Sequence, residues 1–303
     1  MIPGFLLFLR TMRTHDVILI NPCGRTGEIV SASLSRHGLR VLTLTGPSAR
    51  KNEDLYIRTL KKAVEETGAE MIVPVFFPEV LAAHKEEFPG VLIPLDTADN
   101  IMLLDDKLSA CRLVSGLGIR QPRIYGDISE VEDFPVVFKR PSGQGGDSVY
   151  FPKTRRALEN LSRTSAEYLV EDFVEGENVS VDAVRWDGGF FHAAAYRVLL
   201  PHGKGVSTLR ESMDAPELVE SVKTILDAVD YKGVCGVDFI RESGSGEYFF
   251  LECNPRFSGG VESAIASGFD IPWVYWCLAH GESVPRGCLE FKSGIRTGIE
   301  SVL

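Results

Sequence analysis

Residues 247–260 read EYFFLECNPRFSGG, a run that begins as a strong β-strand and ends in polar residues. Tyr, Phe and Leu fit a half-buried pleated surface, so the first half predicts a strand. Three polar side chains then follow within five positions, namely Glu252, Asn254 and Arg256. A carboxylate, an amide and a guanidinium at the end of such a strand are unusual for a purely structural element. The segment that precedes the strand suggests why they are there.

A β-hairpin over residues 234–254 is predicted from GVCGVDFIRE, the turn residues SGSG and EYFFLECN. If a five-residue loop 243–247 closes the hairpin, Asp238 lies directly opposite Glu252, with Cβ atoms about 5 Å apart. Side chains alternate between the two faces of a strand. We therefore expect Asp238, Glu252 and Asn254 on one face and an apolar set on the other: Val237, Phe239, Phe249, Leu251 and Cys253.

Two carboxylates that face each other repel, and a bound cation relieves the repulsion. Carboxylate and amide oxygens together with phosphate oxygens are the ligands that Mg²⁺ prefers. The pair Asp238 and Glu252 with Asn254 therefore predicts a magnesium site. The alternative is a register shifted by one residue, which would leave the two carboxylates merely solvated.

Composition limits the class of protein. The chain has 303 residues, 44% of them hydrophobic, and a formal net charge of −10. This acidity argues against nucleic-acid or anionic-membrane partners, because both need a basic face. Six cysteines occur without a C-x-x-C pair, so neither a zinc site nor a disulfide framework is indicated, and a reducing cytoplasm is expected.

The N-terminal run IPGFLLFL is too short for a membrane span and lacks the flanks of a signal peptide. Translation from Met12 instead of Met1 is an open alternative.

The chain changes character along its length. Strands and helices alternate over residues 15–95, which indicates a parallel, Rossmann-like sheet whose last predicted strand is VLIPLD at 91–96. Neither G-x-G-x-x-G nor a P-loop is present. From about residue 122 the strands come in antiparallel-looking pairs, which indicates an α+β fold. A single helix, at 215–229, interrupts these strands, and the segment 262–281 is expected to be mostly helical.

A second polar cluster follows the strand FPVVFK. Lys139 ends that strand, and a glycine-rich stretch follows it: Ser142, Gly143, Gln144, Gly145 and Gly146. Backbone N–H groups of such a loop, beside an ammonium, form a phosphate site. A plain glycine-rich hairpin with an exposed lysine is the competing interpretation, since glycine is also the commonest turn residue.

Taken together, these motifs resemble the ATP-grasp enzymes, particularly the carbamoyl-phosphate-synthase-like and carboxylate–amine ligase members. The resemblance rests on the order and spacing of LLDDKLSACRLVSGLGIRQP, the glycine-rich loop, VEDFVEGENVSVD, GVDFIRE and, as its most specific part, ECNPRFSGG. It implies a Rossmann-like pre-ATP-grasp domain followed by a two-subdomain ATP-grasp fold. The expected divisions are 1–104, 105–175 with the lid, and 176–303.

The resemblance also implies roles for individual residues. ATP would lie between the two subdomains, with Lys107, Lys139 and the loop 142–146 on its phosphates. Asp238, Glu252 and Asn254 match the family's ligands for Mg²⁺, for which Mn²⁺ is an alternative. Arg256 matches the arginine beside the transferring phosphate. The adenine would meet the linker Glu171, Asp172, Phe173 and Val174, and Glu177 is assigned to the ribose because Asn178 occupies the position where the family commonly has glutamate.

The implied activity is that of an ATP-dependent carboxylate–amine ligase. It would phosphorylate a small, amino-acid-like carboxylate and join the acyl phosphate to an amine, with release of ADP and phosphate. The alternatives are a kinase acting on carbamate or bicarbonate and a catalytically silent ATP-binding module. Arg197 is expected near the phosphates or the acceptor carboxylate, with a plain surface arginine as the alternative. Arg296 and Glu262 fit structural roles better than substrate contacts. The expected partners are small molecules, and a homodimer is left open.

Overall fold

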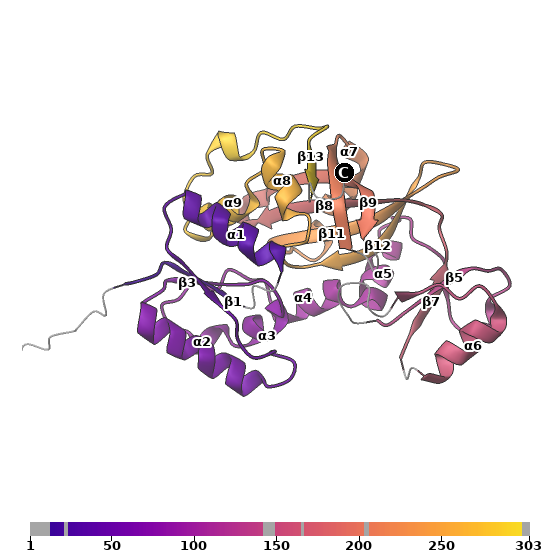
Figure 1. Cartoon of the computed structure of the whole chain (residues 1–303), viewed down its shortest axis with the longest axis horizontal. Helices are drawn as coiled ribbons and strands as arrows, with labels where there is room; N and C mark the ends of the chain where they lie inside the picture. The colour runs from indigo at the N-terminus through magenta and orange to yellow at the C-terminus, as the bar shows by residue number, and fades with distance from the viewer. Residues whose placement is uncertain (1–12, 21–23, 142–148, 165–166, 203–205, 299–303) are drawn as a thin grey trace, which may run out of the picture. The chain divides into compact units, whose positions relative to one another are not determined.

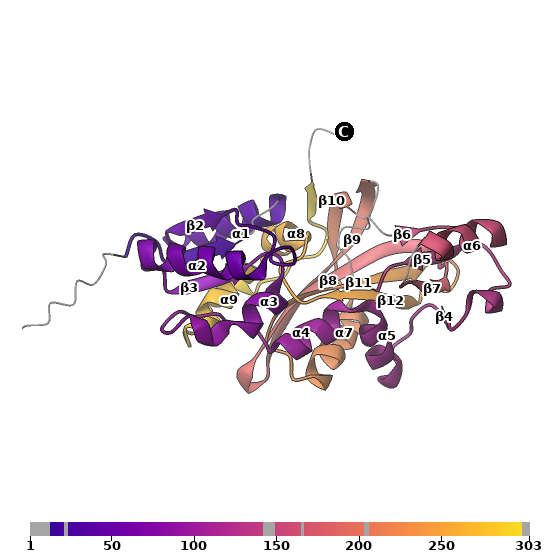
Figure 2. The same cartoon turned by 90° about the horizontal axis from the view of Figure 1, so that it is seen from below.

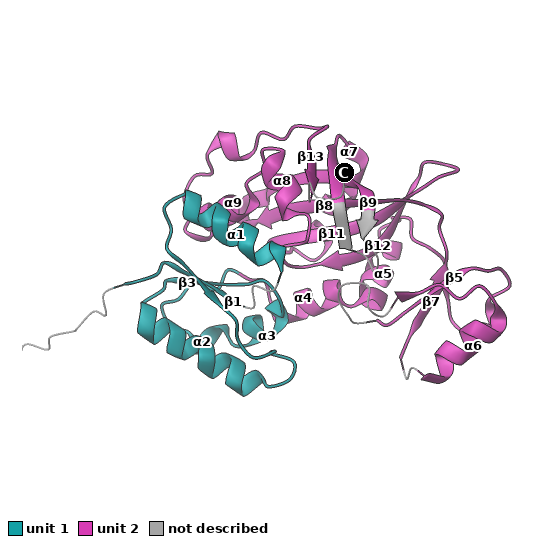
Figure 3. Cartoon of the chain, viewed as in Figure 1, with its two compact units in different colours: residues 1–94 teal, residues 95–303 magenta. Residues whose placement is uncertain are grey.

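The computed structural model describes residues 13–20, 24–141, 149–164, 167–202 and 206–298 (Figure 1). The chain forms two compact units, residues 1–94 and residues 95–303 (Figure 3). The three-way division expected from the sequence stays a prediction. Within the described residues no helix combines the length and the apolar character needed to cross a membrane.

The first unit contains a three-stranded parallel sheet in the order β2-β1-β3. Its central strand is fully buried, which is typical of a parallel strand covered on both faces. Gly68 ends the second helix in the left-handed conformation, with φ 67°, which is typical of a glycine C-cap. The elements are β1 Val17–Ile20, α1 Arg25–Arg36, β2 Val41–Leu44, α2 Glu53–Thr67, β3 Met71–Pro74, α3 Pro78–Ala83 and the 3₁₀ turn Lys85–Glu87.

The strand predicted at 91–96 is wrong. Only one parallel bridge forms there, between Met71 and Leu92. Pro94 has no N–H to donate, so the ladder cannot continue past it. The alternation of strands and helices before it is as expected, while the assignment of this unit as a pre-ATP-grasp domain stays a prediction.

The second unit begins with two helices and a small antiparallel sheet in the order β4-β7-β5-β6. Val136, Phe138, Val170 and Leu158 form a buried core between this sheet and its helix. The elements are α4 Ala98–Asp105, α5 Lys107–Gly116, β4 Ile124–Tyr125, the 3₁₀ turn Ile128–Glu130, β5 Val136–Lys139, β6 Val149–Tyr150, α6 Arg155–Thr164 and β7 Leu169–Asp172.

A six-stranded antiparallel sheet in the order β12-β11-β8-β9-β10-β13 makes up the rest of this unit (Figure 2). The antiparallel pairing after residue 122 is therefore confirmed, and so is the helical character of residues 262–281. The expectation of a single helix among these strands is wrong, because α6 lies between β6 and β7 in addition to α7. The elements are β8 Gly176–Trp186, the 3₁₀ turn Asp187–Gly189, β9 Phe190–His202, β10 Val206–Met213, α7 Pro216–Ala228, β11 Gly233–Glu242, β12 Tyr248–Asn254, α8 Val261–Ala266, α9 Ile271–Ala279, the 3₁₀ turn Arg286–Cys288 and β13 Arg296–Gly298.

Candidate functional site

The hairpin β11–β12 brings Asp238 directly opposite Glu252, as predicted. The pairs between the turn and Asp238, however, differ from the predicted ones. Arg241 pairs with Tyr248 instead of Phe249, so the turn is one residue shorter than expected. An irregularity on the other strand, at Leu251, then restores the pairing before Glu252. This is a β-bulge, in which one extra residue on one strand has no partner opposite it.

The bulge corrects the predicted apolar face. Phe250, not Phe249 or Leu251, is fully buried, and its ring packs edge-on against Phe239 at a centroid distance of 5.9 Å. Phe249 and Leu251 are only partly buried, because the extra residue changes which side chains face the core. The same bulge exposes the Leu251 carbonyl to the Lys139 ammonium, which makes a long contact of 3.5 Å to it.

Asp238 and Glu252 share a polar neighbour, the side-chain amide of Asn254. Its Nδ2 donates to Asp238 Oδ2 at 3.1 Å and to Glu252 Oε1 at 3.3 Å. The Ser180 hydroxyl donates to Asp238 Oδ1. Burial and then the charge of Glu252 raise the pKa of Asp238 to about 7. The two carboxylates therefore do repel each other in the folded protein, which is the condition that a cation would relieve.

Lys107 is the first residue of α5, and its side chain is almost completely buried. Asp106 caps this helix by accepting a hydrogen bond from the Ser109 N–H at 2.8 Å, which fixes where the helix begins. Lys107 Nζ lies 2.9 Å from Glu252 Oε2. Burial by itself would raise the pKa of Glu252, but the Lys107 ammonium outweighs it and the pKa lies below its usual value.

Lys139 forms a second buried ion pair. Its Nζ lies 2.7 Å from Glu171 Oε1, and the side chains are 6% and 2% exposed. Burial raises the pKa of Glu171, and the Lys139 ammonium opposes that rise. The other carboxylate oxygen, Oε2, is buried and has no hydrogen-bond partner among the described residues. A buried acceptor left in this state marks a place where a donor is missing.

The predicted nucleotide linker runs out of β7. Phe173 is 41% exposed, and its ring meets Phe151 edge-on at 5.8 Å. Asp172 Oδ1 accepts a hydrogen bond from the Tyr125 hydroxyl at 2.5 Å, and Val174 is partly buried. Glu177 lies at the start of β8. The glycine-rich stretch predicted to bind phosphate, residues 142–146, lies outside the described residues.

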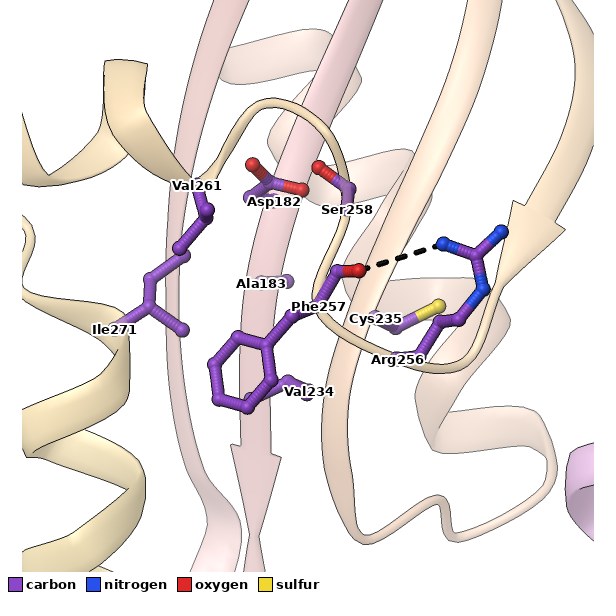
Figure 4. A pocket seen from close by; sticks show the side chains of 9 residues that line it. All are labelled: Asp182, Ala183, Val234, Cys235, Arg256, Phe257, Ser258, Val261 and Ile271. Atoms are coloured by element: carbon purple, nitrogen blue, oxygen red, sulfur yellow. Dashed lines mark hydrogen bonds between the residues drawn. The ribbon is translucent and has the colours of Figure 1, made fainter. Parts of the chain in front are cut away.

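Arg256 follows the end of β12 and lies beside the carboxylate pair. One of its terminal nitrogens donates to Asn254 Oδ1 at 2.8 Å, and the other donates to the Phe257 carbonyl at 3.4 Å (Figure 4). Asn254 thus links the carboxylates to the guanidinium, giving its N–H groups to the former and its oxygen to the latter.

Arg197 and Arg296 lie on either side of Glu211. The ion-pair distances are 2.6 Å in both cases, and Arg197 Nε is also 3.9 Å from Glu177 Oε1. Arg296 therefore forms the structural ion pair that the sequence favoured. The structure gives Arg197 the same carboxylate partner, and its expected role near the phosphates stays a prediction. Glu262 lies in the first turn of α8.

Sequence reasoning missed a second polar group on the same face of the large sheet. Asp182 of β8 is 3% exposed and accepts a hydrogen bond from the Tyr196 hydroxyl at 3.3 Å. Asp182 lines a small pocket together with Arg256 and Ser258 (Figure 4). The sequence pattern could have predicted this group. Ser180 and Asp182 alternate with valines in NVSVDAV, and alternate residues of a strand share one face.

The chemistry of the donor set fits a hard divalent cation. Among the described residues no three His, Cys, Asp or Glu side chains gather as a metal-binding group. A cation would instead use Asp238, Glu252 and the Oδ1 atom of Asn254, two carboxylates and an amide oxygen of the kind that Mg²⁺ takes alongside phosphate oxygens. Asn254 Oδ1 accepts from Arg256 here, so ligation by that atom requires the amide to turn.

Two curated relatives match the chain by sequence. The carbamoyl-phosphate synthase of Methanobrevibacter smithii is 24% identical over 216 residues, which is 65% of this chain and 53% of that protein. The D-alanine–D-alanine ligase of Fusobacterium nucleatum is 24% identical over 160 residues, 49% of this chain and 55% of that protein. The matches thus span about half the length of each relative. Residues 164–299 match a family described as ATP-grasp in the biosynthetic pathway with Ter operon.

Solved structures share the fold. A biotin carboxylase–β,γ-ATP complex from Campylobacter jejuni matches 93% of this chain and 74% of its own, with TM-score 0.76 and 15% identity. The biotin carboxylase domain of 2-oxoglutarate carboxylase from Hydrogenobacter thermophilus, solved with MgADP, ADP and bicarbonate, covers 94% and 74%, with TM-score 0.72 and 15% identity. The L-amino acid ligase from Bacillus licheniformis covers 93% and 78%, with TM-score 0.70 and 14% identity. The resemblance drawn from the motifs is confirmed.

Proposed function

We propose that the chain is a member of the ATP-grasp superfamily and, within it, an ATP-dependent carboxylate–amine ligase. It phosphorylates a small, amino-acid-like carboxylate and joins the product to an amine. The finer parts of this proposal, namely the substrates, ADP formation and dependence on Mg²⁺, are supported by the geometry of the site and by the ligases among the similar proteins.

One observation carries the proposal. Two buried lysines from separate elements, Lys107 of α5 and Lys139 of β5, both reach the strand β12 that holds Glu252. Arg256 lies at the end of the same strand and contacts Asn254. Three cations thus surround a carboxylate pair. Phosphoryl transfer depends mainly on positioning and charge neutralisation, and this arrangement offers both.

Asp238, Glu252 and Asn254 would hold the Mg²⁺. When bound, the ion would neutralise charge on the phosphate oxygens. Lys107, Lys139 and Arg256 would bind and orient the polyphosphate.

The chemical steps need no nucleophilic side chain. A carboxylate oxygen of the substrate attacks the γ-phosphorus, the bond to the β,γ-bridging oxygen breaks, and ADP leaves. The amine then attacks the acyl carbon of the acyl phosphate, phosphate leaves with the bonding electrons, and the amine loses a proton. Arg256 is placed to stabilise charge on the transferring group. Exclusion of water protects the acyl phosphate from hydrolysis.

Glu171 is the best candidate to recognise the adenine. Its Oε2 atom is a buried acceptor that lacks a donor among the described residues, and an exocyclic amino group is such a donor. Lys139 holds the other oxygen, so the carboxylate has a fixed direction. Phe173 and Val174, which follow it in the linker, would offer apolar contacts to the base. Glu177 remains the candidate for the ribose.

Phosphorylation of carbamate or bicarbonate is the second candidate. It is favoured by the match to a carbamoyl-phosphate synthase and by the similarity in fold to biotin carboxylases. The two activities differ in what they need. A ligase releases ADP only with a matching acid and amine, whereas a bicarbonate kinase releases ADP with bicarbonate and no amine.

The test is ADP release measured with a panel of amino acids, small carboxylates and bicarbonate, with and without Mg²⁺ and with Mn²⁺ as an alternative. We expect release that needs the metal and one acid–amine pair. Absence of ATP binding by calorimetry in Mg²⁺ would refute the proposal. Binding without turnover on any substrate would identify a silent module. A homodimer and a cytoplasmic location stay predictions.

A further inference from the structure

Asp182 is a buried carboxylate that the proposed reaction does not use. Burial raises its pKa to about 6, although a hydrogen bond from Ser258 opposes the rise. An ionisable group in such a position is costly unless hydrogen bonds satisfy it. An apolar residue would fill the position at lower cost, so the contacts of the carboxylate need an explanation.

Those contacts converge on the loop that follows the signature strand, residues 255–260. The Tyr196 hydroxyl lies 3.3 Å from both Asp182 Oδ2 and Ser258 Oγ, so it bridges the carboxylate and the loop. Ser258 Oγ in turn accepts the backbone N–H of Gly260 at 2.7 Å. A chain of polar contacts therefore runs from Asp182 in the sheet, through Tyr196 and Ser258, to the backbone of the loop at Gly260.

Two glycines let the loop approach the sheet this closely. Gly236 lies beside Asp182 in the sheet, and a Cβ atom there would lie 2.6 Å from Ser258 Cβ. A Cβ atom at Gly260 would lie 1.7 Å from the Tyr196 hydroxyl oxygen. Neither distance is tolerated by real side chains, so the sheet and the loop fit together only without those atoms.

The loop carries Arg256 at its start, so the position of the loop sets where this guanidinium lies beside the carboxylate pair. A misplacement of about 1 Å in such a group costs as much as about 100-fold in rate. Arg210 adds a second cation on the same side, with its guanidinium 5.7 Å from the centre of the Tyr196 ring. The positive charges of Arg210 and Arg256 both oppose the rise in the pKa of Asp182.

We propose that Asp182 is a positioning residue: through Ser258 and Tyr196 it fixes the loop 255–260 on the sheet and so holds Arg256 in place. The effect on turnover rests on the proposed function, whereas the effect on the loop does not. Asp182 acts through the loop and touches no reacting atom.

Hydrogen exchange and kinetics together test this. In Asp182→Asn and in Ser258→Ala we expect backbone amides of the loop to exchange at least about tenfold faster, because the same hydrogen-bond chain is broken. Turnover should fall about 10- to 100-fold, while the Kd for MgATP stays within about threefold. The double variant should lose little more turnover than either single variant, since both act through one contact.

Asp96 supplies the matched control. It is also a buried carboxylate of the second unit, and it accepts backbone N–H groups of Thr97 and Lys232 at 2.6 and 2.7 Å. Asp96→Asn should lower stability without faster exchange in the loop. Should Asp182→Asn not fold, Ser258→Ala and Tyr196→Phe carry the test.

Unchanged loop exchange in the folded variants would overturn the proposal. Faster exchange spread over the whole sheet, as from general destabilisation, would overturn it as well. A wild-type protein that fails to bind ATP would refute the proposed function, and the exchange measurement would still decide whether Asp182 fixes the loop.

Discussion

Lys107 Nζ lies 2.9 Å from Glu252 Oε2, although one residue begins the helix α5 and the other lies near the end of the strand β12. Lys107 is 9% exposed in its side chain, so little water is available to replace the carboxylate. The pair joins α5, the second helix of the second unit, to the candidate metal site. Its loss should therefore affect both stability and turnover.

Glu252→Ala should abolish turnover and lower the free energy of unfolding. Removal of Glu252 takes this carboxylate from the buried Lys107, which costs about 3–5 kcal/mol in a fully buried pair and less here because Glu252 is partly exposed. Urea unfolding and ADP release measure the two effects. Glu247→Ala is the control, since Glu247 pairs with Arg120 at the surface, and it should cost less than about 1 kcal/mol and leave turnover intact. Full turnover in Glu252→Ala would exclude Glu252 from the site.

Lys139→Met should destabilise the protein more than the double variant Lys139→Met with Glu171→Leu. The single change leaves the Glu171 carboxylate buried without its cation, at a cost of about 3–5 kcal/mol, whereas replacing both partners by apolar residues avoids that cost. Urea unfolding of the three proteins checks the order. An equal loss in the single and double variants would show that the ion pair does not dominate this site. Both variants should bind ATP weakly.

Gly260→Ala should lower stability and turnover, because its methyl group would collide with the Tyr196 hydroxyl. Clashes in a packed interior typically cost about 1–3 kcal/mol. Gly244→Ala is the control, since a Cβ atom there meets nothing within 4 Å. Thermal unfolding and ADP release compare the two. A neutral Gly260→Ala would mean that the loop moves away from the sheet without consequence.

The stability of the first unit should fall as pH rises past neutrality. Hydrogen bonds to Glu53 and Glu87 raise the pKa of His84, so its stabilising effect is complete below its unfolded pKa of 6.5 and is lost as pH rises through the folded value. The contribution should be about 1 kcal/mol or less, because both carboxylates are well exposed. Unfolding measured from pH 5.5 to 8.5 in wild type and His84→Gln tests this. An unchanged pH dependence in His84→Gln would contradict it.

Several features of the site were predictable because they depend on local pattern. Alternation along β11 and β12 placed Asp238 opposite Glu252, and the motif order indicated the superfamily. The apolar face was predicted incorrectly because a β-bulge at Leu251 leaves little trace in the sequence. The turn is one residue shorter than expected and the bulge adds one residue, so the two errors cancel at Glu252 but not between the turn and Leu251. The strand at 91–96 failed for a visible reason, the proline at position 94.

The sequence by itself determined the resemblance to ATP-grasp enzymes, the antiparallel sheets of the second unit and the polar residues that end β12. These follow from residue type and from spacing within one or two neighbouring strands. The tertiary structure decided which cation meets which carboxylate, since Lys107, Lys139 and Glu171 approach their partners only through packing of separate elements. It also decided the position of Asp182 beneath the loop of Ser258, because that contact depends on the close approach allowed by two glycines on different segments.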